Sequence, residues 1–142
     1  MAVICDTGAI YALYDFDDAH HSSVRTAFET EEGPFLVPAP LLAEIDYMLH
    51  VHLGVDAALD FLESLEIGAF SLEALVPGDL LRCRELMEVY RDLNLGLADA
   101  SVVAFAERLN LQRLLTVDVR HFRTVRPRHV PHFILLPADS NA

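Results

Sequence analysis

The sequence predicts a three-layer α/β/α fold, in which helices cover both faces of a mostly parallel central sheet. Short apolar runs, each long enough for one buried strand, alternate along the chain with longer helical segments. Strands buried on both faces are continuous apolar runs, and parallel neighbours need a crossover helix between them. A chain of 142 residues can bury a substantial core. We therefore expect a single α/β domain over residues 1–142.

The first half of the chain contains two apolar strands, each followed by helices. Residues 2–5 are apolar throughout, and residues 35–37 follow a loop at 31–34 that contains glycine and proline. Pro38 and Pro40 suit the opening of a helix, because the first turn needs no backbone N–H donor. The elements predicted in this half are a strand at 2–5, a helical segment at 9–30 interrupted near 15–18, a strand at 35–37, and helices at 38–52 and 55–65.

The second half continues the alternation and ends in a strand. Pro77 opens a helix, and the turn Asn94-Leu95-Gly96 precedes an almost wholly apolar helix. A loop rich in proline and arginine comes before the last strand. The predicted elements are strands at 69–72, 113–117 and 133–136, and helices at 77–92 and 97–109.

Aspartates stand at the ends of two predicted strands. Asp6 follows the first strand directly, and Asp118 comes at the end of the segment L-L-T-V-D. Open α/β sheets bind ligands at the carboxyl ends of their strands. Asp6 has a second explanation, because an aspartate before a helix also caps its free backbone N–H groups. The repetition of the pattern favours a site.

Two further acids lie on predicted helices. Asp99 lies on the inward stripe of the apolar helix L-A-D-A-S-V-V-A-F-A, where a carboxylate is costly unless it is paired or bound to metal. The simpler alternative is that Asp99, in the first turn, favours the helix dipole. Glu44 and Asp46 flank the apolar stripe of the helix at 38–52 on opposite edges, and spacing alone does not choose between them.

Several function classes are excluded by missing motifs. The chain has no lysine, so it has no P-loop, and it has no G-x-G-x-x-G dinucleotide motif. The seven histidines fit no strong metal-binding spacing, and we expect them to be surface or packing residues. Cys5 and Cys83 form no C-x-x-C and are expected to be reduced thiols of a cytoplasmic protein. No apolar run approaches the roughly 18 residues of a membrane span, and we expect no signal peptide.

The charge is distributed unevenly along the chain. The net charge is −12, and all ten basic residues are arginine. Residues 1–107 carry a net −16, whereas residues 108–142 carry six arginines and two acids, a net +4. Two explanations remain open: a chance cluster on a solubilising surface, or arginines that meet phosphates near an acidic site. Apolar residues make up 53% of the chain, so either the core is large or apolar surface meets a partner.

Four segments together resemble the PIN-domain ribonucleases, and more narrowly the VapC-type toxins of toxin–antitoxin pairs. They are D-T-G-A-I at 6–10, L-L-A-E-I at 41–45, L-A-D-A-S at 97–101 and T-V-D-V-R-H-F at 116–122. The resemblance covers nearly the whole chain and implies a PIN-like fold. It chooses Glu44 over Asp46. It implies an acidic metal site and catalytic centre of Asp6, Glu44, Asp99 and Asp118, with Thr7 and Thr116 as polar helpers. Gly8 stands where some relatives have serine.

The chemistry implied by the resemblance is metal-dependent hydrolysis of RNA. Carboxylates without a histidine or cysteine partner make an oxygen-only site suited to Mg²⁺ or Mn²⁺, which would activate water at a phosphodiester. The resemblance also implies a homodimer and a cognate antitoxin that covers the site. The residues expected to hold the RNA backbone are Arg120, Arg123, Arg126 and Arg128. A non-catalytic PIN-like interaction module and a phosphohydrolase for small substrates remain as alternatives.

Overall fold

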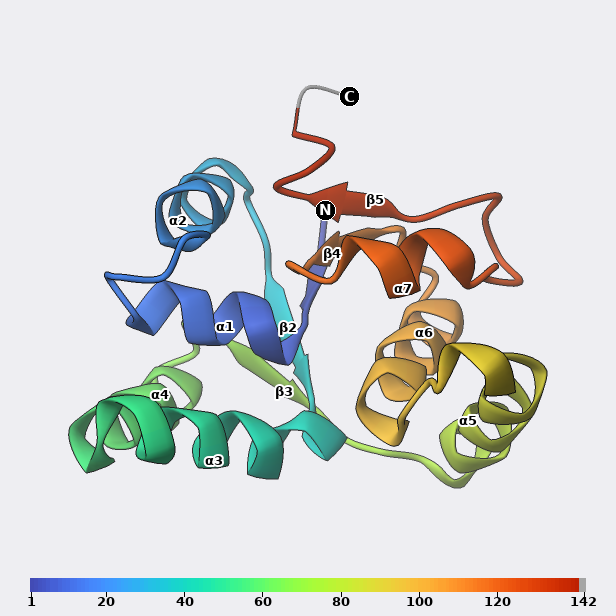
Figure 1. Ribbon diagram of the computed structural model, residues 1–142, viewed down its shortest axis with the longest axis horizontal. Coiled ribbons are helices and arrows are strands. Elements are labelled where there is room, and N and C mark those ends of the chain that lie inside the picture. Colours follow the sequence, from blue (N-terminus) through green and yellow to red (C-terminus); the bar gives the residue numbers. More distant parts are fainter. Residues whose placement is uncertain (141–142) are drawn as a thin grey trace.

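Five short parallel strands form the central sheet of the protein (Figure 1). The computed structural model describes residues 1–140 of the chain. The strands are β1 (Val3–Cys5), β2 (Phe35–Pro38), β3 (Ser71–Glu73), β4 (Arg113–Leu115) and β5 (Ile134–Leu136). Their order is β3-β2-β1-β4-β5, and every neighbouring pair is parallel. The expected parallel sheet is confirmed, with β1 at its centre.

Helices cover both faces of this sheet, as the three-layer prediction requires. Helices α1 to α4 lie on one side of the sheet and α5 to α7 on the other (Figure 1). The helices are α1 (Thr7–Tyr14), α2 (His21–Thr30), α3 (Leu42–Leu53), α4 (Val55–Glu66), α5 (Pro77–Val89), α6 (Leu97–Leu109) and α7 (Val119–Thr124), with short 3₁₀ turns η1 (Ala39–Leu41) and η2 (Arg91–Leu93). Among residues 1–140 no helix is long and apolar enough to cross a membrane.

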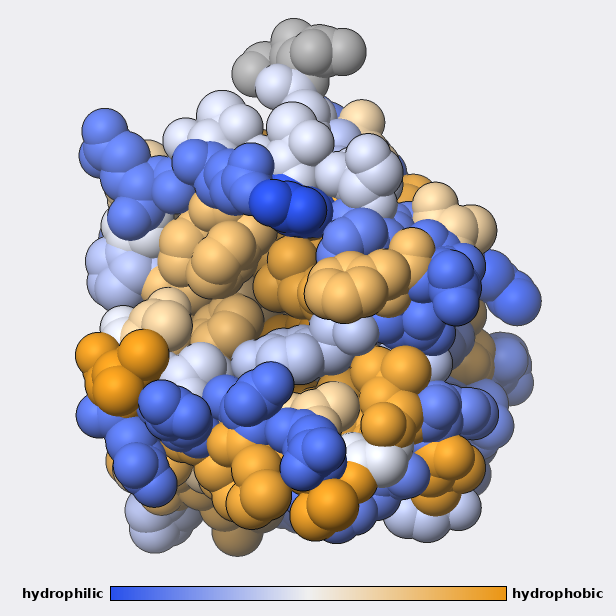
Figure 2. Space-filling model, turned by 90° about the vertical axis from the view of Figure 1, so that its left-hand side faces the viewer, coloured by the Kyte–Doolittle hydropathy of each residue, from blue (hydrophilic) through white to orange (hydrophobic). Residues whose placement is uncertain are grey.

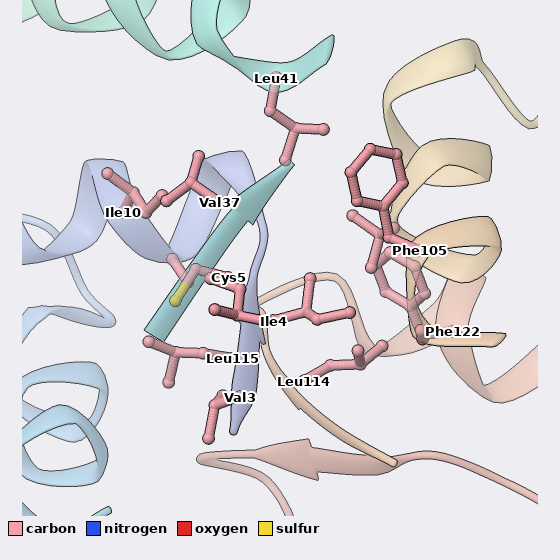
Figure 3. Packing of buried hydrophobic residues seen from close by; sticks show 14 of the residues in the cluster. Val3, Ile4, Cys5, Ile10, Val37, Leu41, Phe105, Leu114, Leu115 and Phe122 are labelled. Atoms are coloured by element: carbon pink, nitrogen blue, oxygen red, sulfur yellow. The ribbon is translucent and has the colours of Figure 1, made fainter. Parts of the chain in front are cut away.

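The core lies on both faces of the sheet, because neighbouring side chains of a strand point in opposite directions. Ile4 and Leu114 point toward Phe105 of α6, whereas Cys5 lies on the side of Ile10 of α1 (Figure 3). In α6 every residue from 100 to 106 is buried. The apolar helix is therefore internal, and its first turn brings Asp99 to the end of the sheet.

The main difference from the prediction lies after β4. The segment before the last strand was expected to be an irregular loop, but it contains the helix α7. Only Phe122 is buried in this helix, so the apolar periodicity that reveals longer helices is missing. The Asp118 side chain caps α7 by accepting a hydrogen bond from the His121 backbone N–H. This unforeseen helix adds a side chain to the candidate site.

Candidate active site

Asp6 lies at the carboxyl end of β1 and is 5% exposed. Its two carboxylate oxygens accept hydrogen bonds from the Thr7 backbone N–H and the Thr116 hydroxyl, each at 2.9 Å. Burial, followed by the negative charge of Asp99, raises the pKa of Asp6 from 3.8 to about 7. Asp6 caps α1, and its carboxylate lies at the carboxyl end of the central strand, where a ligand site was expected.

Thr116 connects Asp6 to a second predicted acid. This residue follows β4 and is 1% exposed. Its hydroxyl donates to Asp6 Oδ2 and accepts from the Asp118 backbone N–H, both at 2.9 Å. A hydroxyl can donate one hydrogen bond while it accepts another, so both contacts form at once. Thr116 therefore holds the end of β1 and the start of α7 in a fixed relation.

Asp99 and Asp118 converge with a histidine at the same end of the sheet. His121 Nδ1 lies 2.8 Å from Asp99 Oδ2 and 2.9 Å from Asp118 Oδ2. One ligand atom from each of the three residues lies within 4.8 Å of the others. Burial raises the pKa of Asp99, the hydrogen bond with His121 opposes this, and the negative charges of Asp118 and Glu44 add to the rise.

Glu44 lies in the first turn of α3, on the other side of a groove from Asp99. The groove has a volume of about 500 Å³ and is lined by Pro40, Ala43, Glu44, Gly96, Leu97, Ala98 and Asp99. The side chain of Glu44 is exposed. Asp46 instead makes an ion pair with His50 on the same helix, at 3.3 Å. The structure therefore places Glu44, and not Asp46, on the groove that Asp99 lines.

His121 corrects two expectations from the sequence. Histidines were expected to be surface or packing residues, and the acids were expected to have no histidine partner. The structure places His121 directly between Asp99 and Asp118. The available signal was the spacing D-V-R-H, because residues three apart on a helix lie on one face. That signal requires a helix at α7, which the sequence pattern did not indicate.

The donors present fit a divalent cation. Clustered carboxylates whose pKa values are raised repel one another, and a cation removes that repulsion. Thr7, next to Asp6, is 3% exposed, and its buried Oγ1 has no hydrogen-bond partner in the part of the chain that the structure describes. Buried polar atoms without partners are uncommon and point to a missing ligand or water. Oxygen-rich donor sets of this kind suit Mg²⁺ and Mn²⁺.

The four arginines expected to contact RNA differ in their surroundings. Arg123 pairs with Asp139, and Arg128 pairs with Glu85 at 2.7 Å. The side chains of Arg120 and Arg126 are exposed and form no ion pair within residues 1–140. Arg120 directly precedes His121 on α7. The structure thus separates two free guanidinium groups from two that are already paired.

This fold and this acidic cluster define a known class of protein. Residues 3–126 match the family model of the PIN domain. The chain is also 31% identical over 135 residues to Ribonuclease VapC26 of Mycobacterium tuberculosis, a match that covers 95% of this chain and 100% of that protein. The chain therefore belongs to the PIN-domain family, among its VapC ribonucleases.

Solved structures show the same fold at lower sequence identity. VapC20 of Mycobacterium tuberculosis, described as a toxin that cleaves the sarcin–ricin loop, superposes with a TM-score of 0.76 and 17% identity, over 84% of this chain and 92% of that one. A toxin–antitoxin complex from Klebsiella pneumoniae gives a TM-score of 0.69 and 18% identity, over 94% of this chain and 100% of that one. VapBC2 of Rickettsia felis, bound to a fragment of its promoter DNA, gives a TM-score of 0.64 and 14% identity, over 95% of this chain and 97% of that one.

Proposed function

We propose that this protein is an endoribonuclease that hydrolyses RNA phosphodiester bonds with Mg²⁺ or Mn²⁺, and that it is the toxin of a toxin–antitoxin pair. The observation that carries the proposal is the meeting of Asp6, Asp99 and Asp118, from three separate elements, at one end of the sheet. The 31% identity to a VapC ribonuclease over nearly the whole chain supports the same activity.

Asp6, Glu44, Asp99 and Asp118 would hold the cation. A bound divalent cation lowers the pKa of a water molecule and stabilises charge on the phosphate oxygens. Asp99 and Glu44 line the groove through which a phosphodiester reaches the site. Thr116 keeps Asp6 and Asp118 in position through its two hydrogen bonds, and the hydroxyl of Thr7, the residue after Asp6, has no hydrogen-bond partner among residues 1–140.

We place the RNA backbone against the exposed arginines of α7 and the loop that follows it. Arg120 and Arg126 are the first candidates because their side chains are exposed and form no ion pair within residues 1–140. Arg123 and Arg128 would contact phosphates only in exchange for their present acidic partners. Guanidinium groups bind phosphate oxygens well and position a nucleic acid without reading its sequence.

The partners we propose are a second copy of the chain and a cognate antitoxin, acting in the cytoplasm. Exposed apolar side chains are scattered among polar ones on the side of the molecule formed by α1 to α4 (Figure 2). Leu59 and Ile67 are 56% and 73% exposed. The similarity to a toxin–antitoxin complex from Klebsiella pneumoniae supports an antitoxin as one partner.

Cleavage assays with purified protein test the activity. We expect RNA cleavage with Mg²⁺ or Mn²⁺, none with EDTA, and losses of at least about 100-fold for Asp6→Asn and Asp99→Asn, as expected when metal-assisted catalysis is disabled. Asp118→Asn should lose less than Asp6→Asn. Asp46→Asn is the matched control for Glu44→Gln, because Asp46 is an acid on the same helix and pairs with His50.

Three outcomes would contradict the proposal. Cleavage that persists in EDTA and leaves a cyclic phosphate would indicate a general-base histidine in place of a metal. A folded protein that binds its antitoxin but cuts no RNA with either metal would favour a non-catalytic interaction module. Hydrolysis of small phosphate esters without cleavage of RNA would favour a phosphohydrolase.

A further inference from the structure

We propose that His121 is a nitrogen ligand of the bound cation and that it makes the site prefer Mn²⁺ to Mg²⁺. The inference rests on the proposed metal-dependent function. It concerns a residue outside the acidic set, and it can be measured without RNA. Four observations of geometry and chemistry carry it.

The first observation is the position of the ring nitrogen. Nδ1 of His121 lies 2.8 Å from an oxygen of Asp99 and 2.9 Å from an oxygen of Asp118. Ligand atoms of all three residues lie within 4.8 Å of one another, which is close enough to surround a single ion. His121 thus already lies beside the two carboxylates proposed to bind the metal.

The second observation is that α7 holds this side chain in place. Asp118 caps the helix by accepting the backbone N–H of His121 at 3.2 Å, and Asp118 is itself held by Thr116. The next residue, Phe122, is 2% exposed, and its ring packs edge-on against Phe133 with centroids 6.4 Å apart. With Phe122 anchored in the core and Asp118 capping the helix, the position of His121 is determined by the fold.

The third observation comes from comparison with a second histidine–aspartate pair, which lies at the surface. His50 also faces an aspartate on its own helix, Asp46, at 3.3 Å, but both side chains are nearly half exposed. The His121 and Asp99 side chains are 24% and 20% exposed, and a second carboxylate reaches the same nitrogen. A single pair at the surface needs no further explanation, whereas two carboxylates converging on one imidazole resemble a ligand set.

The fourth observation concerns the ligands that the two metals prefer. Mg²⁺ takes oxygen ligands almost exclusively and keeps several waters. An imidazole nitrogen is a softer donor that suits transition metals, and Mn²⁺ shares the carboxylate preference of Mg²⁺ while accepting nitrogen. Adding one imidazole to a carboxylate cluster should therefore raise the affinity for Mn²⁺ relative to Mg²⁺.

Pulsed electron paramagnetic resonance of bound Mn²⁺ tests the nitrogen ligand directly. The parent protein should show ¹⁴N modulation from a coordinated imidazole, and His121→Asn should abolish it. Titration calorimetry should show that His121→Asn lowers the affinity for Mn²⁺ by roughly 10- to 100-fold, the range measured when residues around a bound metal are changed. The affinity for Mg²⁺ should fall by less. His121→Asp should restore Mg²⁺ affinity without ¹⁴N modulation. His50→Asn, which removes the surface pair, should match the parent.

Each alternative role of His121 predicts a different result. If His121 only occupies the place of the cation, His121→Asn will bind both metals more tightly, which overturns the proposal. If it only orients Asp99 and Asp118, the parent will lack ¹⁴N modulation and the ratio of the two affinities will not change, which also overturns it. A parent protein that cuts RNA with Mn²⁺ but lacks the modulation contradicts this inference alone, whereas modulation without any cleavage contradicts the proposed function. Melting curves in EDTA establish that each variant is folded.

Discussion

At the scale of single residues, Asp6 is both the cap of a helix and a candidate metal ligand. Its carboxylate caps α1 and accepts a hydrogen bond from Thr116, yet burial beside Asp99 raises its pKa to about 7. A residue chosen for stability alone would not have an ionised form that the fold disfavours. The raised pKa therefore fits a carboxylate kept for a ligand.

The raised pKa of Asp6 predicts how stability depends on pH without metal. The unfolded chain releases this proton near pH 3.8 and the folded protein near 7. Between these values the folded state binds the extra proton, so its stability falls as pH rises through that window. Asp6→Asn removes this effect. In EDTA above pH 7 we expect the variant to be more stable by roughly 2–4 kcal/mol, at about 1.4 kcal/mol per pKa unit.

Urea denaturation of parent and Asp6→Asn at several pH values in EDTA measures this difference. The two stability curves should separate as pH rises from about 4 to 7 and then run parallel. Asp46→Asn, a change at the surface pair with His50, is the control and should follow the parent. Curves of parent and Asp6→Asn that stay parallel throughout would show that Asp6 is only a helix cap.

Two threonines beside Asp6 should respond in opposite ways to loss of the hydroxyl. Thr116→Val removes hydrogen bonds to Asp6 and to the backbone of Asp118, so we expect a loss of about 1–3 kcal/mol and weaker cleavage. Thr7→Val removes a buried hydroxyl with no partner among residues 1–140, so the metal-free protein should be unchanged or slightly more stable. Thr116→Ser should recover most of the loss. Equal destabilisation by both valine variants would contradict the hydrogen-bond assignment.

The site could be predicted residue by residue to a limited depth. Asp6 and Asp118 follow from their place after strands, and Asp99 follows from its apolar helix. Glu44 could be chosen over Asp46 only through the family resemblance, because both lie at the edges of the apolar stripe and spacing alone does not choose between them. His121 was missed because its role depends on a short helix with a single buried side chain.

At the scale of elements, the apolar runs predicted the order of strands and helices well. Long or fully apolar elements such as α6 repeat their pattern enough to be recognised, whereas α7 spans only residues 119–124 and has no repeat. The expected strand at 113–117 ends at Leu115 as β4, and the next residue, Thr116, donates its hydroxyl to Asp6. The candidate site residues thus begin where the regular element stops.

The contact between α1 and the residues after β4 gives a prediction at this scale. A Cβ atom on Gly8 of α1 would lie 2.8 Å from Val117 Cγ2, closer than side chains pack. Val117 is branched and lies between Thr116 and Asp118, so it cannot move without disturbing the site. We expect Gly8→Ala to destabilise the fold by about 1–3 kcal/mol, as overpacking does, and to reduce cleavage.

Removing the clash should reverse the sign of this effect. In a Val117→Ala background, Gly8→Ala should be neutral or stabilising by up to about 1 kcal/mol, because alanine favours a helix more than glycine does. Urea denaturation of the four proteins gives the coupling between the two positions. Additive effects would show that Gly8 is needed for another reason.

At the scale of the whole molecule, the uneven charge of the sequence is partly cancelled by folding. Arg108 pairs with Asp79, Arg113 with Glu31, and Arg128 with Glu85. These ion pairs connect the basic segment at residues 108–142 to the acidic remainder of the chain. Part of the basic segment therefore has a local structural role on the surface. The sequence could show how much charge residues 1–107 and 108–142 carry but not which charges meet, because that depends on the folded arrangement.

Arg120 and Arg126, which form no ion pair within residues 1–140, should set the salt dependence of RNA binding. Each phosphate contact contributes about 0.7 to the slope of log K against log salt for single-stranded nucleic acid. Replacing Arg120 and Arg126 together by glutamine should therefore lower the slope by up to about 1.4 and leave stability unchanged, since both side chains are exposed. Replacing Arg123 and Arg128 should lower stability slightly and should lower the slope less, because both guanidinium groups are already paired with acids.

Binding is measured by fluorescence anisotropy in EDTA, where no cleavage occurs, and Arg25→Gln, which breaks a surface pair with Glu29, serves as the control. A slope lowered equally by both pairs would mean that RNA displaces the ion pairs of the fold. A slope lowered by neither would place the RNA on another face and leave the basic segment with a purely structural role.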